Sequence, residues 1–403
     1  MKKFDIPAYF KSPIIGKVKA KRKLEDPLKK DFSPSILSVG NIDFIIGRHF
    51  GFCYGVENAI EKSYLALKEN PDKKIYLLSQ MIHNPDVNRD LNDLGVDFIQ
   101  DTSGKQLLPW STITKDDVVI IPAFGTTLET QEILESKGID ILTYNTTCPF
   151  VEKVWNRSAS LGNSDHTIII HGKFNHEETK ATFSHSNKNS PSVVIKDLSE
   201  ARILASYIND EIDAENLMKR LGDKCSDGFE PKKHLDKIGV VNQTTMLASE
   251  TLEISEFFKR TMEEKYGSAN LKDHFADTRD TLCYATNDNQ SATLKLAQEK
   301  ADLAFVIGGY NSSNTSHLVE ILESKLPTYF IKNEDEIISK GELNAYDIHT
   351  DKVTKHSDFL PSSERLKIII TSGASCPDSI VDGVIKRLLD VTDNSFNLDE
   401  IKI

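Results

Sequence analysis

The sequence LAFVIGGYNSSNTS, residues 303–316, contains the pattern that decides the fold. Its first five residues form a continuous apolar run of strand length, and a polar loop rich in Gly, Ser and Asn follows and leads into a helical pattern. A strand that is apolar on both faces and precedes a helix is typical of a buried parallel sheet. In such folds ligands bind beyond the carboxyl ends of the strands. The loop after residue 307 is therefore a candidate binding site.

The same succession of strand, polar loop and helix recurs from about residue 42 to residue 390. Strands are expected at residues 44–46, 74–79, 118–122, 139–144, 167–171, 193–195, 238–241, 303–307, 328–331 and 366–371. This alternation predicts an α/β protein with parallel sheets. Residues 209–237 are polar and charged, interrupt the alternation, and are interpreted as an insertion or a surface excursion.

Composition and charge exclude several classes of protein. The 403 residues carry a net charge of −12, which argues against non-specific binding of nucleic acid. No apolar run approaches the roughly 18 residues of a membrane helix, and no apolar core follows Lys2 and Lys3 as in a secretory signal. We therefore expect no membrane partner and a cytoplasmic location. Residues 1–40 are basic, rich in lysine and proline, and are interpreted as a solvated tail.

Three of the five cysteines occupy similar places. Cys53 and Cys148 each follow an expected strand and open a helix, and Cys283 precedes the helical pattern that starts near residue 290. A helix N-terminus lowers the pKa of a thiol and favours the thiolate that binds metal. Three thiolates from separate segments would suit a [4Fe–4S] cluster with one open iron, but scattered cysteines are also common as inert core thiols. Cys225 and Cys376 are interpreted as structural.

Polar motifs at the other strand ends favour an anion site. Histidines follow two strands at His83 and His176. The loop 308–316, with Gly, Ser and Asn, and the loop 373–378, with Gly, Ser and Asp, each open a helix. Backbone N–H groups, hydroxyls and a helix dipole at one place can hold a small diphosphate. Each motif alone also has an ordinary explanation as a helix cap or a structural histidine.

Glu178 lies two residues after His176, and two interpretations of it stay open. A carboxyl enclosed near a pocket can hold a proton at neutral pH and deliver it to a substrate. An exposed acid in the first turn of a helix would be stabilised by the helix dipole instead.

Together these motifs resemble the 4-hydroxy-3-methylbut-2-enyl diphosphate reductase family, of the LytB/IspH type. The resemblance runs from about residue 44 to residue 385. Its segments are 51–56, 83–88, 122–127, 146–155, 171–182, 242–245, 282–290, 310–318 and 372–378.

The resemblance implies three small α/β domains in a trefoil arrangement around a central [4Fe–4S] cluster. It implies that the cluster ligands are Cys53, Cys148 and Cys283. It also implies a reaction in which two electrons and two protons remove the allylic hydroxyl of the substrate, giving isopentenyl and dimethylallyl diphosphate and water. An external one-electron donor of the ferredoxin or flavodoxin type would supply the electrons.

The resemblance also implies roles for the polar residues. Glu178 matches the acid that delivers a proton, and Thr244 matches the residue that orients the hydroxyl. The matches to the diphosphate-binding residues are His83, His176, Ser312, Ser313, Asn314 and Ser375. One departure is Phe124, which stands where many bacterial members have a further diphosphate-binding histidine. This departure resembles the branch that includes plant and cyanobacterial enzymes, and it predicts that Phe124 shapes the pocket wall.

The domain boundaries that we expect follow from this pattern. They are a basic extension at 1–40, α/β domains at 41–147, 148–280 (with the insertion near 209–237) and 281–390, and a tail at 391–403. Two alternative functions stay open: a [4Fe–4S] dehydratase without redox chemistry, and a non-catalytic iron–sulfur sensor.

Overall fold

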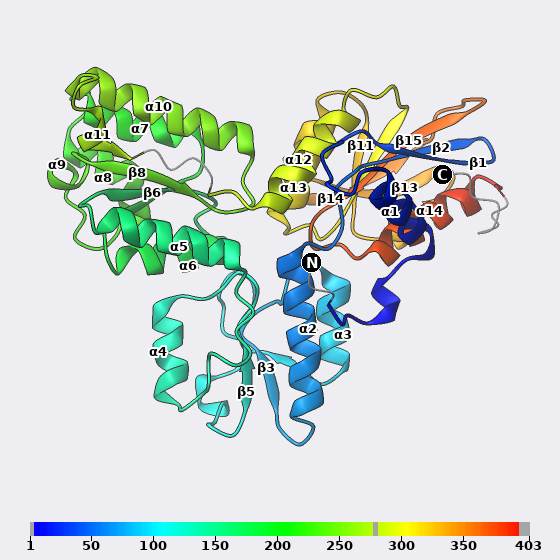
Figure 1. The fold of residues 1–403 in the computed structure, drawn as a ribbon, viewed down its shortest axis with the longest axis horizontal. Helices are drawn as coiled ribbons and strands as arrows, with labels where there is room; N and C mark the ends of the chain where they lie inside the picture. Colours follow the sequence, from blue (N-terminus) through cyan, green and yellow to red (C-terminus); the bar gives the residue numbers. More distant parts are fainter. Residues whose placement is uncertain (1–3, 277–280, 395–403) are drawn as a thin grey trace. The chain divides into compact units, whose positions relative to one another are not determined.

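The computed structural model describes residues 4–276 and 281–394, and the chain folds as two compact units (Figure 1). The first unit consists of Met1–Glu61, Ile82–Arg89 and Tyr284–Ile403, and the second consists of Lys62–Met81 and Asp90–Cys283. No helix in the described ranges is long and apolar enough to cross a membrane.

The first unit is built on a five-stranded sheet in the order β1-β2-β15-β10-β11. β1 is antiparallel to β2, and the other neighbours are parallel. The strands are β1 (Ser35–Val39), β2 (Ile42–Ile46), β10 (Leu303–Ile307), β11 (Thr328–Ile331) and β15 (Leu366–Ser372). Both faces of the sheet are apolar, which explains why β10 and residues 368–370 of β15 are continuously apolar instead of alternating.

Helices bury both faces of this sheet. α1 (Pro13–Glu25) and α14 (Asp378–Val391) pack on the face that carries Phe44 and Phe305. α12 (Tyr284–Leu296) and α13 (Ser313–Glu323) pack on the face that carries Ile45 and Val306. The unit also holds α2 (Tyr54–Glu69) and α3 (Pro85–Asp93), which both continue into the second unit, η1 (Ala8–Phe10) and η4 (Glu334–Glu336). A small antiparallel sheet contains β12 (Ile337–Ser339), β13 (Glu342–Asp347) and β14 (Lys352–Ser357).

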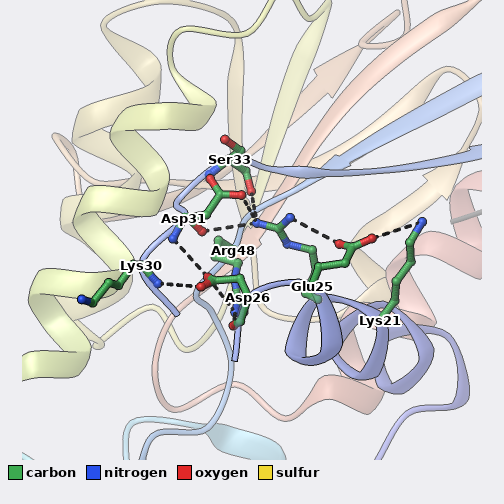
Figure 2. A network of polar contacts seen from close by, with 8 residues as sticks. Lys21, Glu25, Asp26, Lys30, Asp31, Ser33 and Arg48 are labelled. Atoms are coloured by element: carbon green, nitrogen blue, oxygen red, sulfur yellow. Dashed lines mark hydrogen bonds and ion pairs between the residues drawn. The ribbon is translucent and has the colours of Figure 1, made fainter. Parts of the chain in front are cut away.

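The interpretation of residues 1–40 as a solvated tail was wrong. Ile14, Ile15 and Val18 lie on one face of α1 and are almost completely buried against the sheet. Arg22, in the last turn of α1, pairs with Asp31, which follows the helix. Arg48 pairs with Asp26 of the same following segment (Figure 2). The prediction failed because it rested on the average composition, which the lysines dominate. The apolar residues nevertheless recur with the spacing of one helix face.

The second unit contains two parallel sheets. The smaller has the order β4-β3-β5 and the larger the order β7-β6-β8-β9. The strands are β3 (Ile75–Leu77), β4 (Asp97–Phe98), β5 (Val118–Ile120), β6 (Thr167–His171), β7 (Ser192–Ile195), β8 (Ile238–Asn242) and β9 (Phe275–Ala276). The other elements are η2 (Trp110–Thr112), α4 (Leu128–Ser136), α5 (Pro149–Gly162), α6 (Glu177–Asn187), α7 (Leu198–Ile208), α8 (Ala214–Leu221), η3 (Gly222–Lys224), α9 (Pro231–His234), α10 (Ala248–Tyr266) and α11 (Leu271–His274).

Helices again cover both faces of the larger sheet. α7 and α10 pack on the face that carries Ile169 and Val240, and α5 packs on the face that carries Ile168 and Val241. Residues 209–237 are not a surface excursion, because α8 and the loop after it bury Leu217, Leu221 and Phe229 in the same core. The two parallel sheets and the mostly parallel five-stranded sheet, with their helices, confirm the expected α/β class.

The strands do not join their sheets in sequence order. β2 pairs with β15, so that Ile42 lies beside Leu366, although the two strands stand near opposite ends of the sequence. The expected domain boundaries stay a prediction. Residues 395–403 of the expected tail lie outside the described residues.

Candidate active site

In the first unit, the loop after β10 meets the loop after β15. Ser312 caps the N-terminus of α13, because its hydroxyl accepts a hydrogen bond from the Thr315 N–H. Two residues further on, the side-chain Oδ1 of Asn314 accepts the N–H of Ala374 at 3.0 Å. Both loops lie at the carboxyl ends of neighbouring parallel strands, where the sequence predicted a site.

The His83 segment joins the same place. The Ser375 hydroxyl donates a hydrogen bond to the backbone oxygen of His83 at 3.1 Å. Gly309 lies so close that an added Cβ would stand 2.3 Å from that same oxygen. The first unit therefore brings together five of the six residues that were expected to bind diphosphate: His83, Ser312, Ser313, Asn314 and Ser375.

This group of side chains is polar, buried and placed at a helix start. Ser313 and Asn314 are each less than 5% exposed. Within the described ranges, the Ser313 hydroxyl has no hydrogen-bond partner. A buried hydroxyl without a partner is costly unless a ligand bonds to it, and the first N–H groups of α13 favour an anion. The arrangement can hold a phosphate group.

Cys53 follows β2 and directly precedes α2. Its N–H donates to the carbonyl of Ala374 at 3.2 Å, which ties this turn to the loop after β15. Burial raises the pKa of the Cys53 thiol, while the backbone N–H groups of Val56 and Gly55 lower it. The helix start thus lowers the pKa of Cys53, as expected, but burial raises this pKa by more.

In the second unit, the Glu178 carboxyl is bonded to Thr244. One carboxyl oxygen accepts the Thr244 N–H at 2.5 Å, and the other accepts the Thr244 hydroxyl at 3.0 Å. The Glu178 side chain is only 2% exposed. Burial raises the pKa of Glu178 to about 7, against the lowering effect of the two hydrogen bonds. The interpretation of Glu178 as an exposed helix-start acid is therefore excluded.

His176 is the N-cap of α6. Its Nδ1 accepts the N–H of Glu178 at 3.2 Å, so the proton of the neutral ring lies on Nε2, which is then a donor. The ring of Phe124 stands edge-on to the His176 ring, with centroids 5.8 Å apart and planes at 83°. Phe124 thus packs against a predicted binding residue.

Three further residues support these loops; the sequence analysis included Trp155 and Gln243 in longer segments without a role and did not name His185. Trp155 stacks on His185 with centroids 3.7 Å apart, and His185 Nε2 lies 3.1 Å from the carbonyl of Thr126. Gln243 Oε1 accepts the N–H of Lys173 at 3.1 Å and the hydroxyl of Thr179 at 3.0 Å. Gln243, the neighbour of Thr244 in the sequence, therefore holds the loop that leads to His176. Its position directly after a strand was the available signal.

Cys148 and Cys283 also belong to the second unit. Cys148 is the N-cap of α5, and its N–H donates to Ala123 at 3.0 Å. The expected strand at residues 139–144 was wrong, because only Asn145 forms a bridge, with Ile121. Cys283 directly precedes α12, and its N–H donates to the carbonyl of Thr244 at 3.3 Å.

The cysteines divide into two kinds. Cys53, Cys148 and Cys283 each stand at the start of a helix. Cys376 is fully buried in the core of the first unit, and the Cys225 thiol lies 3.3 Å from the carbonyl of Leu221, with its pKa raised by burial to about 12. None of the five, all of which lie in the described ranges, forms a disulfide. Thiolates suit an iron–sulfur cluster, and the assignment of the first three cysteines as its ligands stays a prediction.

Within the part of the chain that the structure describes, no group of three or more His, Cys, Asp or Glu side chains stands ready to hold a metal ion. The fit of the three cysteines to a cluster therefore rests on their chemistry and on their places at helix starts.

Comparisons with known proteins extend over most of the chain. The family model described as LytB protein matches residues 44–389. A protein of Synechococcus sp. (strain ATCC 27144) named 4-hydroxy-3-methylbut-2-enyl diphosphate reductase is 42% identical over 88% of this chain and 87% of its own length. A protein of Gloeobacter violaceus with the same name is 37% identical over 92% of this chain and 90% of its own length.

Two solved structures have a similar fold. One is described as (E)-4-hydroxy-3-methyl-but-2-enyl diphosphate reductase, the terminal enzyme of the non-mevalonate pathway; it has 27% identity and a TM-score of 0.50, over 86% of this chain and 99% of that chain. The reductase from Plasmodium falciparum has 21% identity and a TM-score of 0.62, over 87% of this chain and 89% of that chain, and it supports the fold alone. The family model, the curated relatives and the folds agree, and the chain belongs to the LytB protein family.

Proposed function

We propose that this protein reduces (E)-4-hydroxy-3-methylbut-2-enyl diphosphate to isopentenyl diphosphate and dimethylallyl diphosphate. Two electrons and two protons enter, the bond between C4 and its hydroxyl oxygen breaks, and the oxygen leaves as water. The observation that carries the proposal is the Glu178 carboxyl, which is buried, bonded to Thr244 and has a pKa of about 7. A group with such a pKa can release a proton at neutral pH.

The diphosphate is assigned to the loops after β10 and β15. The Ser313 hydroxyl, which lacks a partner in the described ranges, is available to donate to a phosphate oxygen. Ser312, Asn314 and Ser375 supply further polar groups from the same loops, with His83 beside them. In the second unit, the Nε2–H of His176 is a donor of fixed direction. Binding of this distant group can be used to hold the reacting carbon in place.

Thr244 and Glu178 are assigned to the hydroxyl that leaves. The Thr244 hydroxyl donates to the carboxyl oxygen, so its own oxygen is oriented to accept a further hydrogen bond. It can therefore orient the substrate hydroxyl, while the protonated Glu178 delivers the proton that turns this hydroxyl into water.

The cofactor that we propose is a [4Fe–4S] cluster with Cys53, Cys148 and Cys283 as its ligands. Such a cluster, when bound, supplies electrons one at a time and a Lewis-acidic iron. An external donor of the ferredoxin or flavodoxin type would reduce it. The cytoplasm is the proposed compartment, because five cysteines without a disulfide fit a reducing environment.

An anaerobic assay tests the function. The purified protein with its cluster is mixed with reduced viologen and the hydroxymethylbutenyl diphosphate, and products are separated by chromatography. We expect both isoprenoid diphosphates and two viologen radicals oxidised per substrate. Consumption of substrate without oxidation of viologen would support a non-redox dehydratase, and no consumption would support a sensor; either result would overturn the proposal.

A further inference from the structure

We propose that Lys19 is a positioning residue that fixes both the turn of Cys53 and the loop of Ser375. Its loss is expected to weaken diphosphate binding and to speed the release of the cluster. This inference rests on the proposed function. It concerns a helix that precedes the residues matched by the family model, which start at residue 44.

The Lys19 ammonium joins two segments that are far apart in the sequence. Its Nζ donates to the carbonyl of Phe50 at 3.2 Å and lies 2.7 Å from Asp378 Oδ1. It also lies 4.5 Å from the centre of the Phe50 ring. Phe50 stands three residues before Cys53, and Asp378 stands three residues after Ser375. The Lys19 ammonium therefore contacts both the turn that carries Cys53 and the segment that follows Ser375.

Gly51 provides the space for this contact. Its φ angle is +77°, a conformation that favours glycine. A Cβ at this position would stand 2.5 Å from Asp378 Oδ1 and 3.0 Å from Lys19 Nζ. The turn that carries Cys53 is thus shaped around the ion pair, because any larger residue would displace it.

The segment from Gly373 to Asp378 transmits this anchoring to the site. The Ala374 carbonyl accepts the Cys53 N–H, and the Ala374 N–H donates to Asn314. Ser375 donates to the His83 carbonyl. A shift of Asp378 at the start of α14 would therefore displace the hydrogen-bond partners of three segments together. These are the turn of Cys53, the helix start at Asn314 and the segment of His83.

Lys19 itself stands on a fixed support. Asp382 of α14 accepts the N–H groups of Ile14 and Ile15 at 3.2 and 3.1 Å, and it also bonds to the Ser12 hydroxyl. Both isoleucines are fully buried. The chain after the helix is held by the network of Arg48, Asp26, Asp31 and Ser33 (Figure 2). Lys19 is consequently carried by a helix that is packed on the core of this unit.

Aromatic residues of the N-terminal segment contact the same turn. The Phe10 ring lies edge-on to Phe52 at 5.8 Å, and the Phe4 ring lies edge-on to Tyr54 at 5.0 Å. Together with Lys19 above Phe50, these contacts reach Phe50, Phe52 and Tyr54, the residues around Cys53. The N-terminal segment therefore supports the whole turn, and Lys19 is its polar contact.

The experiment compares Lys19→Met with Lys23→Met. Met removes the ammonium and keeps most of the stem, and Lys23 is an exposed lysine of the same helix. Binding of inorganic diphosphate to the apoprotein is measured by calorimetry. Loss of the cluster to a chelator is followed by its absorbance. We expect the Kd of Lys19→Met to rise about three- to tenfold, as for a partly exposed ion pair with an added hydrogen bond, and cluster loss to be faster by a similar factor. Lys23→Met should match the wild type.

Further variants keep the inference falsifiable. Lys19→Arg should restore most of the affinity, and Asp378→Asn should resemble Lys19→Met. The double variant should then be little worse than either single variant, because both remove the same contact. If Lys19→Met does not fold, Asp378→Asn decides, with the exposed Asp390→Asn as its control. Equal diphosphate affinity and cluster retention in Lys19→Met and Lys23→Met would overturn the inference. Neither readout needs turnover, so a failure of the proposed reaction would be seen separately.

Discussion

The Glu178 carboxyl accepts two hydrogen bonds from a single residue, Thr244, through its backbone N–H and its hydroxyl. These bonds favour the charged carboxylate, yet burial away from water outweighs them and the pKa rises to about 7. The same contact fixes the orientation of both side chains. In the roles that we propose for them, the acid and the hydroxyl-orienting residue are therefore held in place before substrate binds.

Glu178→Gln should bind substrate normally and turn over at least about a hundredfold more slowly, because the amide keeps the shape but cannot deliver a proton. Steady-state kinetics with reduced viologen measure this, with kcat reduced and KM nearly unchanged. Glu177→Gln is the matched control, since it changes the neighbouring, half-buried acid in the same helical turn. Equal rates for both variants would exclude Glu178 as the proton donor.

Glu178 should also make stability depend on pH. Its pKa in the folded protein, about 7, lies above the value in the unfolded chain, so the folded state binds the proton more tightly. The free energy of unfolding that this proton contributes is therefore lost as the pH rises from about 4.5 to about 7. The shift corresponds to about 3 kcal/mol in the free energy of unfolding. Denaturant unfolding of the apoprotein should therefore find Glu178→Gln more stable than the wild type at pH 8 and no more stable at pH 4.5. The same difference at both values would contradict the assignment.

Gly309→Ala should damage the diphosphate site, because the new Cβ would collide with the backbone oxygen of His83 at 2.3 Å. That oxygen also accepts the Ser375 hydroxyl, so the loops must separate. We expect an increase of at least about tenfold in KM for the substrate. Gly341→Ala serves as control, since its nearest neighbour would be 3.9 Å away. An unchanged KM in Gly309→Ala would remove this loop from the site.

Serine substitutions of the cysteines should separate the ligands from the rest. Cys53→Ser, Cys148→Ser and Cys283→Ser should each lose nearly all visible cluster absorption and most bound iron. Cys225→Ser should keep both, and Cys376→Ser should keep the cluster while lowering the unfolding temperature, because a polar group replaces a fully buried thiol. Iron analysis after anaerobic reconstitution measures this. A similar iron loss in all five variants would refute the assignment.

The sequence predicted the local features of the site better than its contacts. Apolar runs identified β6, β8, β10 and β15, because continuous apolar strands are easily recognised. The residues after them included Glu178, Thr244 and Asn314, although no local pattern shows that Glu178 bonds to Thr244 across 66 positions. Such pairing depends on which strands are neighbours in the sheet. β6 and β8 are parallel neighbours although β7 lies between them in the sequence.

Average composition misled the prediction where a few apolar residues decide the structure. Five of the 13 residues in 13–25 are basic, yet Ile14, Ile15 and Val18 suffice to bury one face of α1. The opposite error occurred at residues 139–144, where β-branched residues indicated a strand but the chain turns instead. The turn is closed locally, because the Asp140 carboxyl accepts the N–H groups of Leu142 and Thr143.

The β2–β15 pairing has a consequence for biogenesis. Arg365, just before β15, bonds to Asp43 of β2 across 322 positions, and the Ala374 carbonyl that holds the Cys53 N–H lies further on still. A ribosome therefore releases Cys53 long before its supporting loop exists, at a synthesis speed of about 5–20 residues per second. The turn of Cys53 can therefore reach its folded form only after the chain has been made as far as Ala374.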